Sequence, residues 1–175
     1  MNVLRLATLI LVAGLFATFA FPQSKAPQSP SLPQVYQHWL DEDVSFIITS
    51  DERVAFLGLT SDDERKRFVE DFWLRRDPTP GTSKNEFKEE HYRRIAYSNV
   101  HFGWQATQGW KTDRGRIYIV FGPPDEIRVK PAAENGSSAR SILWRYRSTT
   151  GSDRELKFID VCRCGDYRLE SPQGN

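Results

Sequence analysis

Cysteine is nearly absent from this sequence, and histidine is almost as rare. The 175 residues contain two cysteines and three histidines. Two cysteines cannot form the disulfide framework that holds many small secreted folds together. Cys162 and Cys164 lie two residues apart in an expected strand, so a bridge between them would be strained. We interpret them as small, half-buried residues at a strand end, with a strained bridge or an intermolecular bridge as the alternatives.

The motifs of common catalytic and metal sites are missing as well. His38, His91 and His101 lack the spacing of metal ligands, and no His-containing motif lies near the cysteine pair. The sequence contains no G-x-S-x-G, no H-E-x-x-H and no phosphate-binding glycine loop. We therefore expect neither a metal nor a cofactor.

Neither sign of charge dominates the chain, which has 24 basic and 23 acidic residues. A nucleic-acid-binding protein needs a concentrated basic face, so we exclude nucleic acid as a partner. Large aromatic side chains are plentiful, with 5 Trp, 6 Tyr and 11 Phe. They are sufficient to form the core of a single domain of about 140 residues.

Long apolar runs are confined to the amino terminus. After Arg5, the run from Leu6 to Phe21 is almost wholly apolar, and Thr18 and Ala20 provide small residues before a cleavage site. The run is short for a membrane span, which needs about 20 apolar residues. We expect residues 1–20 to be a cleavable signal peptide that directs export to the periplasm or beyond, with an uncleaved anchor as the alternative. A lipid anchor is excluded because no cysteine follows the run.

The rest of the chain divides by composition into a linker, a single domain and a tail. Residues 21–33 are a Pro/Ser/Gln-rich linker with little to bury. Residues 34–170 form a single expected domain, with a helical half over 34–100 and a sheet half over 101–170. Residues 171–175 are a tail. We expect no stable membrane span once the signal is removed.

Sequence signals for helix ends fill the first half of this domain. Three pairs have the spacing of a capping box and predict helix starts: Thr49 with Glu52, Ser61 with Glu64, and Ser83 with Glu86. The proline-rich segment 77–81 ends the second of these helices.

Alternating apolar residues in the second half predict strands. The expected strands cover residues 117–121, 127–129, 142–146, 156–161 and 167–169, with a bulge in the fourth and a turn at Asn135-Gly136. Short turns between strands indicate an antiparallel meander. The fold class is therefore α+β, with amino-terminal amphipathic helices packed on one face of a carboxy-terminal antiparallel sheet of about four or five strands.

Several motifs together identify a family. They are Phe72-Trp73, the segments 76–82, 85–87, 90–94, 121–125 and 144–146, and above all Gly109-Trp110-Lys111-Thr112-Asp113. Over residues 34–170 the sequence resembles the GWxTD-domain proteins, a group of exported bacterial domains without an established activity. The resemblance implies a bacterial, exported domain. The cysteine pair departs from the family's usual pattern of small residues.

The Gly109–Asp113 loop is the best candidate for a functional surface, because Trp and Arg are typical of interfaces. The expected function is that of a non-catalytic binding or structural module of the bacterial envelope. Its partner would be a protein or another envelope component, and carbohydrate is a further possibility. The candidate binding residues are Arg76, Trp104, Trp110, Lys111, Thr112, Asp113, Arg114 and Arg116.

Two other functions remain open. A hydrolase-type enzyme would use Asp77, His91 and Asp113, since paired carboxylates and a histidine can divide acid and base roles. Each also has a structural interpretation, as a turn former, a hydrogen-bonded core histidine and a turn cap respectively. The segment 121–125 is also analogous to turns in envelope assembly factors, although fold analogy does not carry function.

Overall fold

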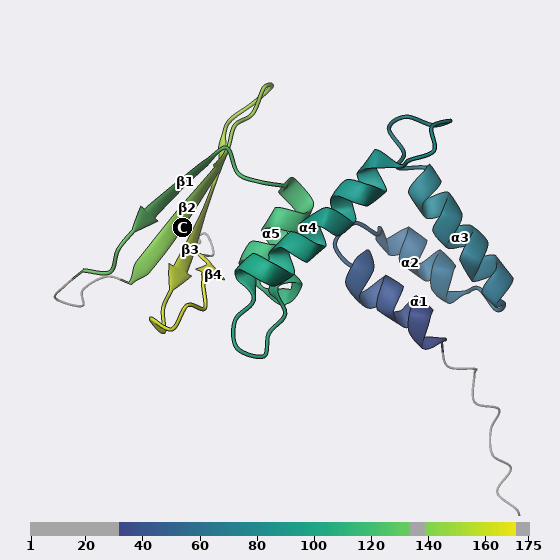
Figure 1. The fold of residues 1–175 in the computed structure, drawn as a ribbon, viewed down its shortest axis with the longest axis horizontal. Coiled ribbons are helices and arrows are strands. Elements are labelled where there is room, and N and C mark those ends of the chain that lie inside the picture. Colours follow the sequence, from purple (N-terminus) through teal and green to yellow (C-terminus); the bar gives the residue numbers. More distant parts are fainter. Residues whose placement is uncertain (1–31, 134–138, 171–175) are drawn as a thin grey trace, which may run out of the picture. The chain divides into compact units, whose positions relative to one another are not determined.

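The computed structural model describes residues 32–133 and 139–170 (Figure 1). One compact unit contains all of them. The expected signal peptide, residues 21–31 of the linker, the Asn135-Gly136 turn and the 171–175 tail lie outside the described residues.

Four helical segments form the first half of the domain (Figure 1). They are α1 (Gln34–His38), which continues into the π-helical turn η1 (Trp39–Asp43), α2 (Ser50–Leu57), α3 (Asp62–Leu74) and α4 (Glu86–Phe102). Capping boxes start α2 at Thr49 and α3 at Ser61, as the sequence predicts.

The third predicted capping box is wrong. Asn85, not Ser83, caps α4, and its side chain accepts a hydrogen bond from the backbone N–H of Lys88 at 2.8 Å. The Asn85 amide also donates to the carbonyl of Trp73 at 2.7 Å, so the cap ties α4 to the end of α3. Glu86 accepts instead from the Thr79 hydroxyl. This contact with the preceding turn, which local spacing does not reveal, takes the carboxylate away from the expected box.

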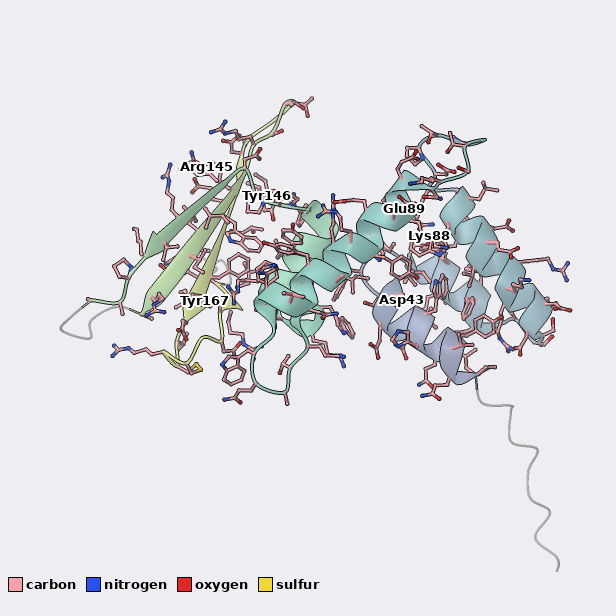
Figure 2. The ribbon with its side chains drawn as sticks, viewed as in Figure 1. Asp43, Lys88, Glu89, Arg145, Tyr146 and Tyr167 are labelled. Carbon is pink, nitrogen blue, oxygen red and sulfur yellow. A yellow bond between two sulfur atoms is a disulfide. The ribbon has the colours of Figure 1, made fainter. Side chains whose placement is uncertain are left out.

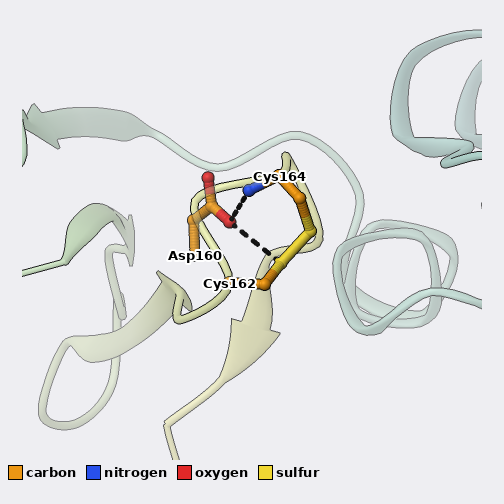
Figure 3. A group of neighbouring side chains, drawn as sticks. All are labelled: Asp160, Cys162 and Cys164. Atoms are coloured by element: carbon orange, nitrogen blue, oxygen red, sulfur yellow. Dashed lines mark hydrogen bonds between the residues drawn. A yellow bond between two sulfur atoms is a disulfide. The ribbon is translucent and has the colours of Figure 1, made fainter.

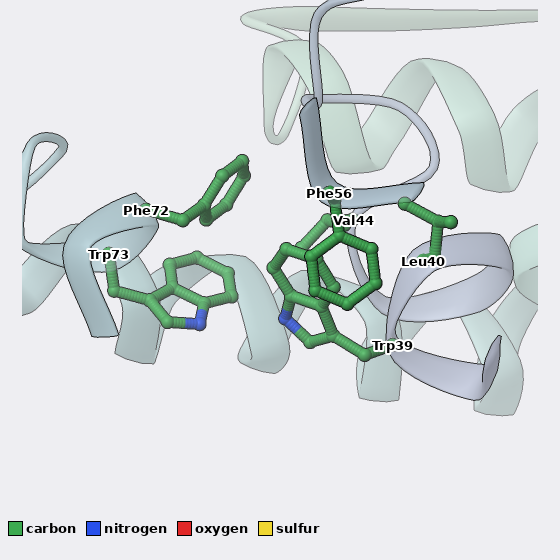
Figure 4. Close-up of a cluster of buried hydrophobic side chains, with 6 residues drawn as sticks. All are labelled: Trp39, Leu40, Val44, Phe56, Phe72 and Trp73. Carbon is green, nitrogen blue, oxygen red and sulfur yellow. The ribbon is translucent and has the colours of Figure 1, made fainter. Parts of the chain in front are cut away.

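Aromatic rings dominate the core of the helical half (Figure 4). Trp39 from η1 contacts Phe56 from α2 and Phe72 from α3, with ring centroids 5.0 and 5.2 Å apart. The buried members of this cluster are Trp39, Leu40, Val44, Phe56, Phe72 and Trp73. Trp73 also contacts Tyr92 on α4, which brings that helix onto the cluster.

The first expected strand is a helix. Residues Asp113–Phe121 form α5, whose start is capped by Thr112 and whose end is marked by Gly122 at φ +79°. Ile117, Tyr118 and Ile119 are consecutive and all buried, so the run at 117–121 shows no single apolar face from which a helix could be recognised. A short apolar run does not distinguish a buried strand from a buried helix. The segment 101–121 therefore belongs with the helices, and the sheet begins later than expected.

Four strands form one antiparallel sheet in the order β1-β2-β3-β4 (Figure 1). They are β1 (Glu126–Lys130), β2 (Arg140–Tyr146), β3 (Arg154–Asp160) and β4 (Arg168–Leu169). The predicted meander and the α+β class are thus confirmed. The predicted bulge is wrong, because the β2–β3 register runs without a break from Arg140 opposite Asp160 to Tyr146 opposite Arg154. Phe158 and Ile159, between which the apolar pattern changes phase, both lie within β3, and Val161 lies beyond its end.

A second core joins the helices to the sheet. Its buried members are Phe102 from α4, Ile117 and Tyr118 from α5, and Trp144, Phe158 and Tyr167 from the sheet half. The ring of Trp144 contacts both Phe102 and Phe158, at 5.5 and 4.8 Å between centroids. Tyr146 and Tyr167 lie on the side of the sheet that meets the helices (Figure 2). Since α4 contacts the first core near its start and the second at its end, it links the two.

Within residues 32–133 and 139–170, no helix has the length and apolar character that a membrane crossing requires.

Candidate functional site

Two glycines allow α4, the short 3₁₀ turn η2 (Gly109–Lys111) and α5 to pack backbone against backbone. A Cβ atom on Gly109 would lie 1.8 Å from the carbonyl oxygen of Ser98 on α4. A Cβ atom on Gly115 would lie 1.9 Å from the carbonyl oxygen of Gly109. No side chain fits at either position, so the glycines are required by close approach and not by an unusual φ.

Hydrogen bonds made by the side chains of Thr112 and Asp113 complete this packing. The hydroxyl of Thr112 donates to the Gly109 carbonyl at 2.8 Å and accepts from the Gly115 N–H at 3.1 Å, which caps α5. The Asp113 carboxylate accepts from the backbone N–H of Leu169 at 2.8 Å. The predicted local turn cap at Asp113 is therefore a long-range bond, which fastens the start of α5 to β4.

Trp110, which lies between Gly109 and Gly115 in the sequence, is buried. Its backbone N–H donates to the Asn99 side chain on α4 at 3.0 Å, and its indole N–H donates to Gln108 at 3.0 Å. Its ring meets the edge of Phe46, with centroids 6.0 Å apart. Of the five motif residues, Lys111 alone is exposed, with its ammonium 4.8 Å from the Trp110 ring.

These contacts explain a family signature as a packing motif. The family model described as the GWxTD domain matches residues 21–163. The chain belongs to this family. No curated protein and no solved structure matches this chain. In this GWxTD domain, Gly109, Trp110, Thr112 and Asp113 connect α4, α5 and β4.

The three candidate catalytic residues have separate partners. Asp77 accepts a hydrogen bond from the Thr79 N–H at 3.0 Å, as a turn former does. His91 is 4% exposed, and its Nε2 lies 2.6 Å from the carbonyl oxygen of Asp43. Burial lowers the pKa of His91, although the bond to Asp43 opposes that shift. Asp113 bonds to β4, as described above.

The structure does not gather these three residues into one cleft. His91 lies near the start of α4, whereas Gly109 contacts Ser98, seven residues further along the same helix. That separation corresponds to about 10 Å along the helix axis. Asp113 is the first residue of α5, and Asp77 lies in the turn that precedes α4.

A small cavity of about 110 Å³ lies beside His91. Its polar lining is the pair Glu90 and Arg94, and its apolar lining includes Ile47 and Phe87. Hydrogen bonds from Arg93 and Arg94 lower the pKa of Glu90 to about 2, with the Arg93 bond as the largest cause. A carboxylate held in this way is a weak proton acceptor, which does not favour acid–base chemistry in this cavity.

Arg76, a candidate binding residue, is an internal structural group. Its guanidinium contacts both carboxylate oxygens of Glu52, at 3.0 and 2.8 Å, and lies 3.7 Å from the Phe72 ring centroid. The hydrogen bond from Arg76 is the main reason that the pKa of Glu52 falls to about 2. This pair fastens α2 to α3 within the helical half.

Trp104 anchors a tight exposed turn to the sheet half. Its indole N–H donates to the carbonyl of Cys164 at 2.8 Å. Its backbone exchanges two hydrogen bonds with Thr107, at 3.1 and 2.8 Å, and this closes the turn around Gln105, whose φ is +47°. We call the surface formed by residues 104–108, Lys111 and 161–165 the Trp104–Cys164 corner.

The two remaining candidate arginines differ in their surroundings. The guanidinium of Arg114 lies 4.5 Å from the Tyr167 ring and 5.1 Å from the Phe102 ring. These ring contacts make it part of the packing beneath the corner, and burial lowers its pKa. Arg116 is exposed and lies 3.5 Å from Asp113.

The bridge between Cys162 and Cys164, an alternative in the sequence interpretation, is present, and Asp160 beside it is a residue that sequence reasoning missed (Figure 3). Cys162 and Cys164 are exposed and bridged, and their Cα atoms are 5.2 Å apart. They are neither half-buried nor strand residues. The chain leaves β3 at Asp160, and Arg163 at φ +56° folds the backbone into a turn that brings the two Cα atoms within bridging distance. The sequence pattern that could have indicated this bridged turn is Asp160 placed two residues before the Cys-x-Cys-Gly segment 162–165.

Proposed function

We propose that this GWxTD domain is an exported, non-catalytic binding module of the bacterial envelope, and that the Trp104–Cys164 corner is its contact surface. Export is proposed from the charged start and apolar run of residues 1–20. The partner is a protein or another component of the envelope.

The observation that carries this proposal is the bracing of an exposed turn. Gln105 and Ala106 are exposed at its tip, while the Trp104–Thr107 bonds and the Trp104–Cys164 bond hold its base. A rigid loop loses little conformational entropy when it binds, so a contact made there is favoured. The buried motif residues Gly109, Trp110 and Thr112 position the turn from beneath and do not contact the partner themselves.

The chemistry of the corner favours acidic or carbohydrate groups on the partner. Lys111 is exposed within it, and Gln105 and Gln108 offer amides. Cationic side chains attract carboxylates and phosphates, and amides beside an indole suit hydroxyl-rich ligands.

The two alternative functions have less support. The hydrolase reading needs Asp77, His91 and Asp113 to act together, and each is engaged in a separate internal contact. The assembly-factor analogy rests on the 121–125 turn. Its Asp125 carboxylate accepts from the N–H of Arg147 at 2.7 Å, so this turn has a structural role in closing the sheet.

Site-specific crosslinking tests the proposal directly. A photoreactive amino acid at Ala106 of the mature protein is expected to capture one discrete envelope component, whereas the same probe at exposed Lys66 on α3 is not. Capture from Ala106 should weaken in a Lys111→Glu background and persist in a Lys66→Glu background, which makes the same charge change elsewhere.

Equal capture from both probe positions would contradict the proposal, as would a lack of any discrete adduct at Ala106. In either case, hydrolysis of glycans and peptides should be assayed with Asp77→Asn and His91→Gln as the comparison variants. A hydrolytic activity that these variants lose would support the enzyme alternative.

A further inference from the structure

The Cys162–Cys164 disulfide lies on the exposed turn between β3 and β4 (Figure 3). Both cysteines are exposed. A bridge that closes only three residues restricts the unfolded chain far less than a bridge across a long loop. It therefore adds little to the stability of the fold, and an external thiol can reach its sulfur atoms.

Hydrogen bonds hold this turn independently of the bridge. Asp160 is 2% exposed, and its carboxylate accepts from the backbone N–H groups of Cys164 at 3.0 Å and Gly165 at 3.1 Å. The Arg163 N–H donates to the Asp160 carbonyl at 3.2 Å, and Trp104 holds the carbonyl of Cys164. The turn should keep its shape when the bridge opens, with the two sulfur atoms still facing each other.

From this geometry we infer that Cys162 and Cys164 are a redox-active pair, which a protein dithiol reduces and a protein disulfide reoxidises. A pre-formed turn favours reclosure because the two thiols do not have to find each other. This inference does not depend on the proposed binding function.

The oxidising direction balances as follows. The thiolate of Cys164 attacks one sulfur of the external disulfide, whose second sulfur leaves with the bonding electrons and takes up a proton. Cys162 then loses its proton and attacks the Cys164 sulfur, and the first external sulfur leaves in the same way. Two electrons and two protons pass from the cysteine pair to the external disulfide, which becomes a dithiol. Reduction is the reverse.

Asp160 makes the two cysteines unequal. One carboxylate oxygen lies 3.5 Å from the sulfur of Cys162 and also bonds the Cys164 N–H. A neighbouring carboxylate disfavours negative charge on Cys162 and accepts a hydrogen bond from its neutral thiol. In the open pair, Cys164 is therefore the attacking sulfur, and the Cys162 thiol donates to Asp160 until it attacks.

The first test equilibrates the mature protein with mixtures of reduced and oxidised dithiothreitol. Free thiols are then blocked with iodoacetamide and counted by mass spectrometry. We expect the doubly alkylated and bridged forms to interconvert reversibly, with an unchanged circular dichroism spectrum. A bridge that cannot form in the folded protein, or that opens only when the protein unfolds, would overturn the inference.

The second test separates the two sulfur atoms with a matched pair of variants. The remaining thiol of Cys162→Ser should react with iodoacetamide at neutral pH about tenfold faster than that of Cys164→Ser. Adding Asp160→Asn to Cys164→Ser should remove most of that difference. Equal rates in the two single variants would eliminate the role given to Asp160, even if the Asp160→Asn protein does not fold.

Discussion

At the scale of single residues, the GWxTD motif depends on the missing side chain of Gly109 as much as on the side chains of Thr112 and Asp113. Gly109 and Gly115 have no side chain because backbone occupies the place where one would stand. Thr112 and Asp113 then satisfy backbone groups on α5 and β4. The signature is thus explained by packing and hydrogen bonding alone.

Gly109→Ala should destabilise the domain by about 3 kcal/mol or more, because the new methyl group would overlap the Ser98 carbonyl oxygen at 1.8 Å. Urea unfolding of the purified protein measures the change. Gly151→Ala is the control, since its Cβ would meet only the Ser148 hydroxyl at 3.5 Å. Similar losses for the two variants would show that α4 and α5 can separate at little cost.

The Glu52–Arg76 pair should make stability depend on pH. The pKa of Glu52 falls from 4.5 to about 2 in the folded protein. Solvent screening limits the contribution of this shift to about 1 kcal/mol, which is fully present above pH 4.5 and is lost as the pH falls towards 2. Glu52→Gln should therefore be less stable than the native protein at pH 7, and the difference should shrink between pH 4.5 and 2.

Unfolding free energies of both proteins across that range measure this effect. Glu70→Gln removes one exposed negative charge from α3 and serves as the control. A native-minus-variant difference that is the same at pH 7 and pH 2.5 would contradict the assignment of the shift to Arg76.

At the scale of elements, α4 has the central position. Its first turns contact the aromatic cluster of the helical half through Tyr92, and its last residue, Phe102, belongs to the sheet-side core. Its start is fixed by Asn85, whose side chain bonds both α4 and α3. A substitution that weakens this cap should therefore also loosen the packing of α4 on α3.

Asn85→Ala should cost about 1–2 kcal/mol, because it removes the cap of α4 and the bond to the Trp73 carbonyl. Ser83→Ala should change stability by less than about 0.5 kcal/mol, since Ser83 does not cap this helix. Thermal and urea unfolding of the two variants decide between the caps. A larger loss for Ser83→Ala would restore the capping box that the sequence predicts.

At the scale of the whole molecule, the two cores are joined through one helix. Phe72 is fully buried in the first, and Phe158 is fully buried in the second. Because α4 contributes to both, we expect the helices and the sheet to unfold together in one transition.

Phe72→Ala should cost about 3–5 kcal/mol through loss of buried surface and creation of a cavity. If the molecule unfolds as one unit, amide hydrogen exchange in β2 and β3 should accelerate in parallel with that in α2 and α3. Unchanged protection of the sheet amides would show that the two cores unfold separately.

The local features of this protein follow from its amino-acid sequence. Short-range rules act within a few residues, so the Thr49 and Ser61 caps and the alternating strand at 142–146 could be read directly. The family followed from the motifs for the same reason, and the α+β class followed from the order of the patterns. Candidate site residues could be named, but not placed.

Features that depend on distant partners required the folded structure. The run at 117–121 is a helix because it is buried against α4 and the sheet, a circumstance that its own alternation does not reveal. Asp113 bonds Leu169, and Trp104 bonds Cys164, across 56 and 60 residues of sequence. The tertiary structure therefore decided which motif residues are internal supports and which exposed turn they brace, because burial and long-range hydrogen bonds are properties of the packed chain.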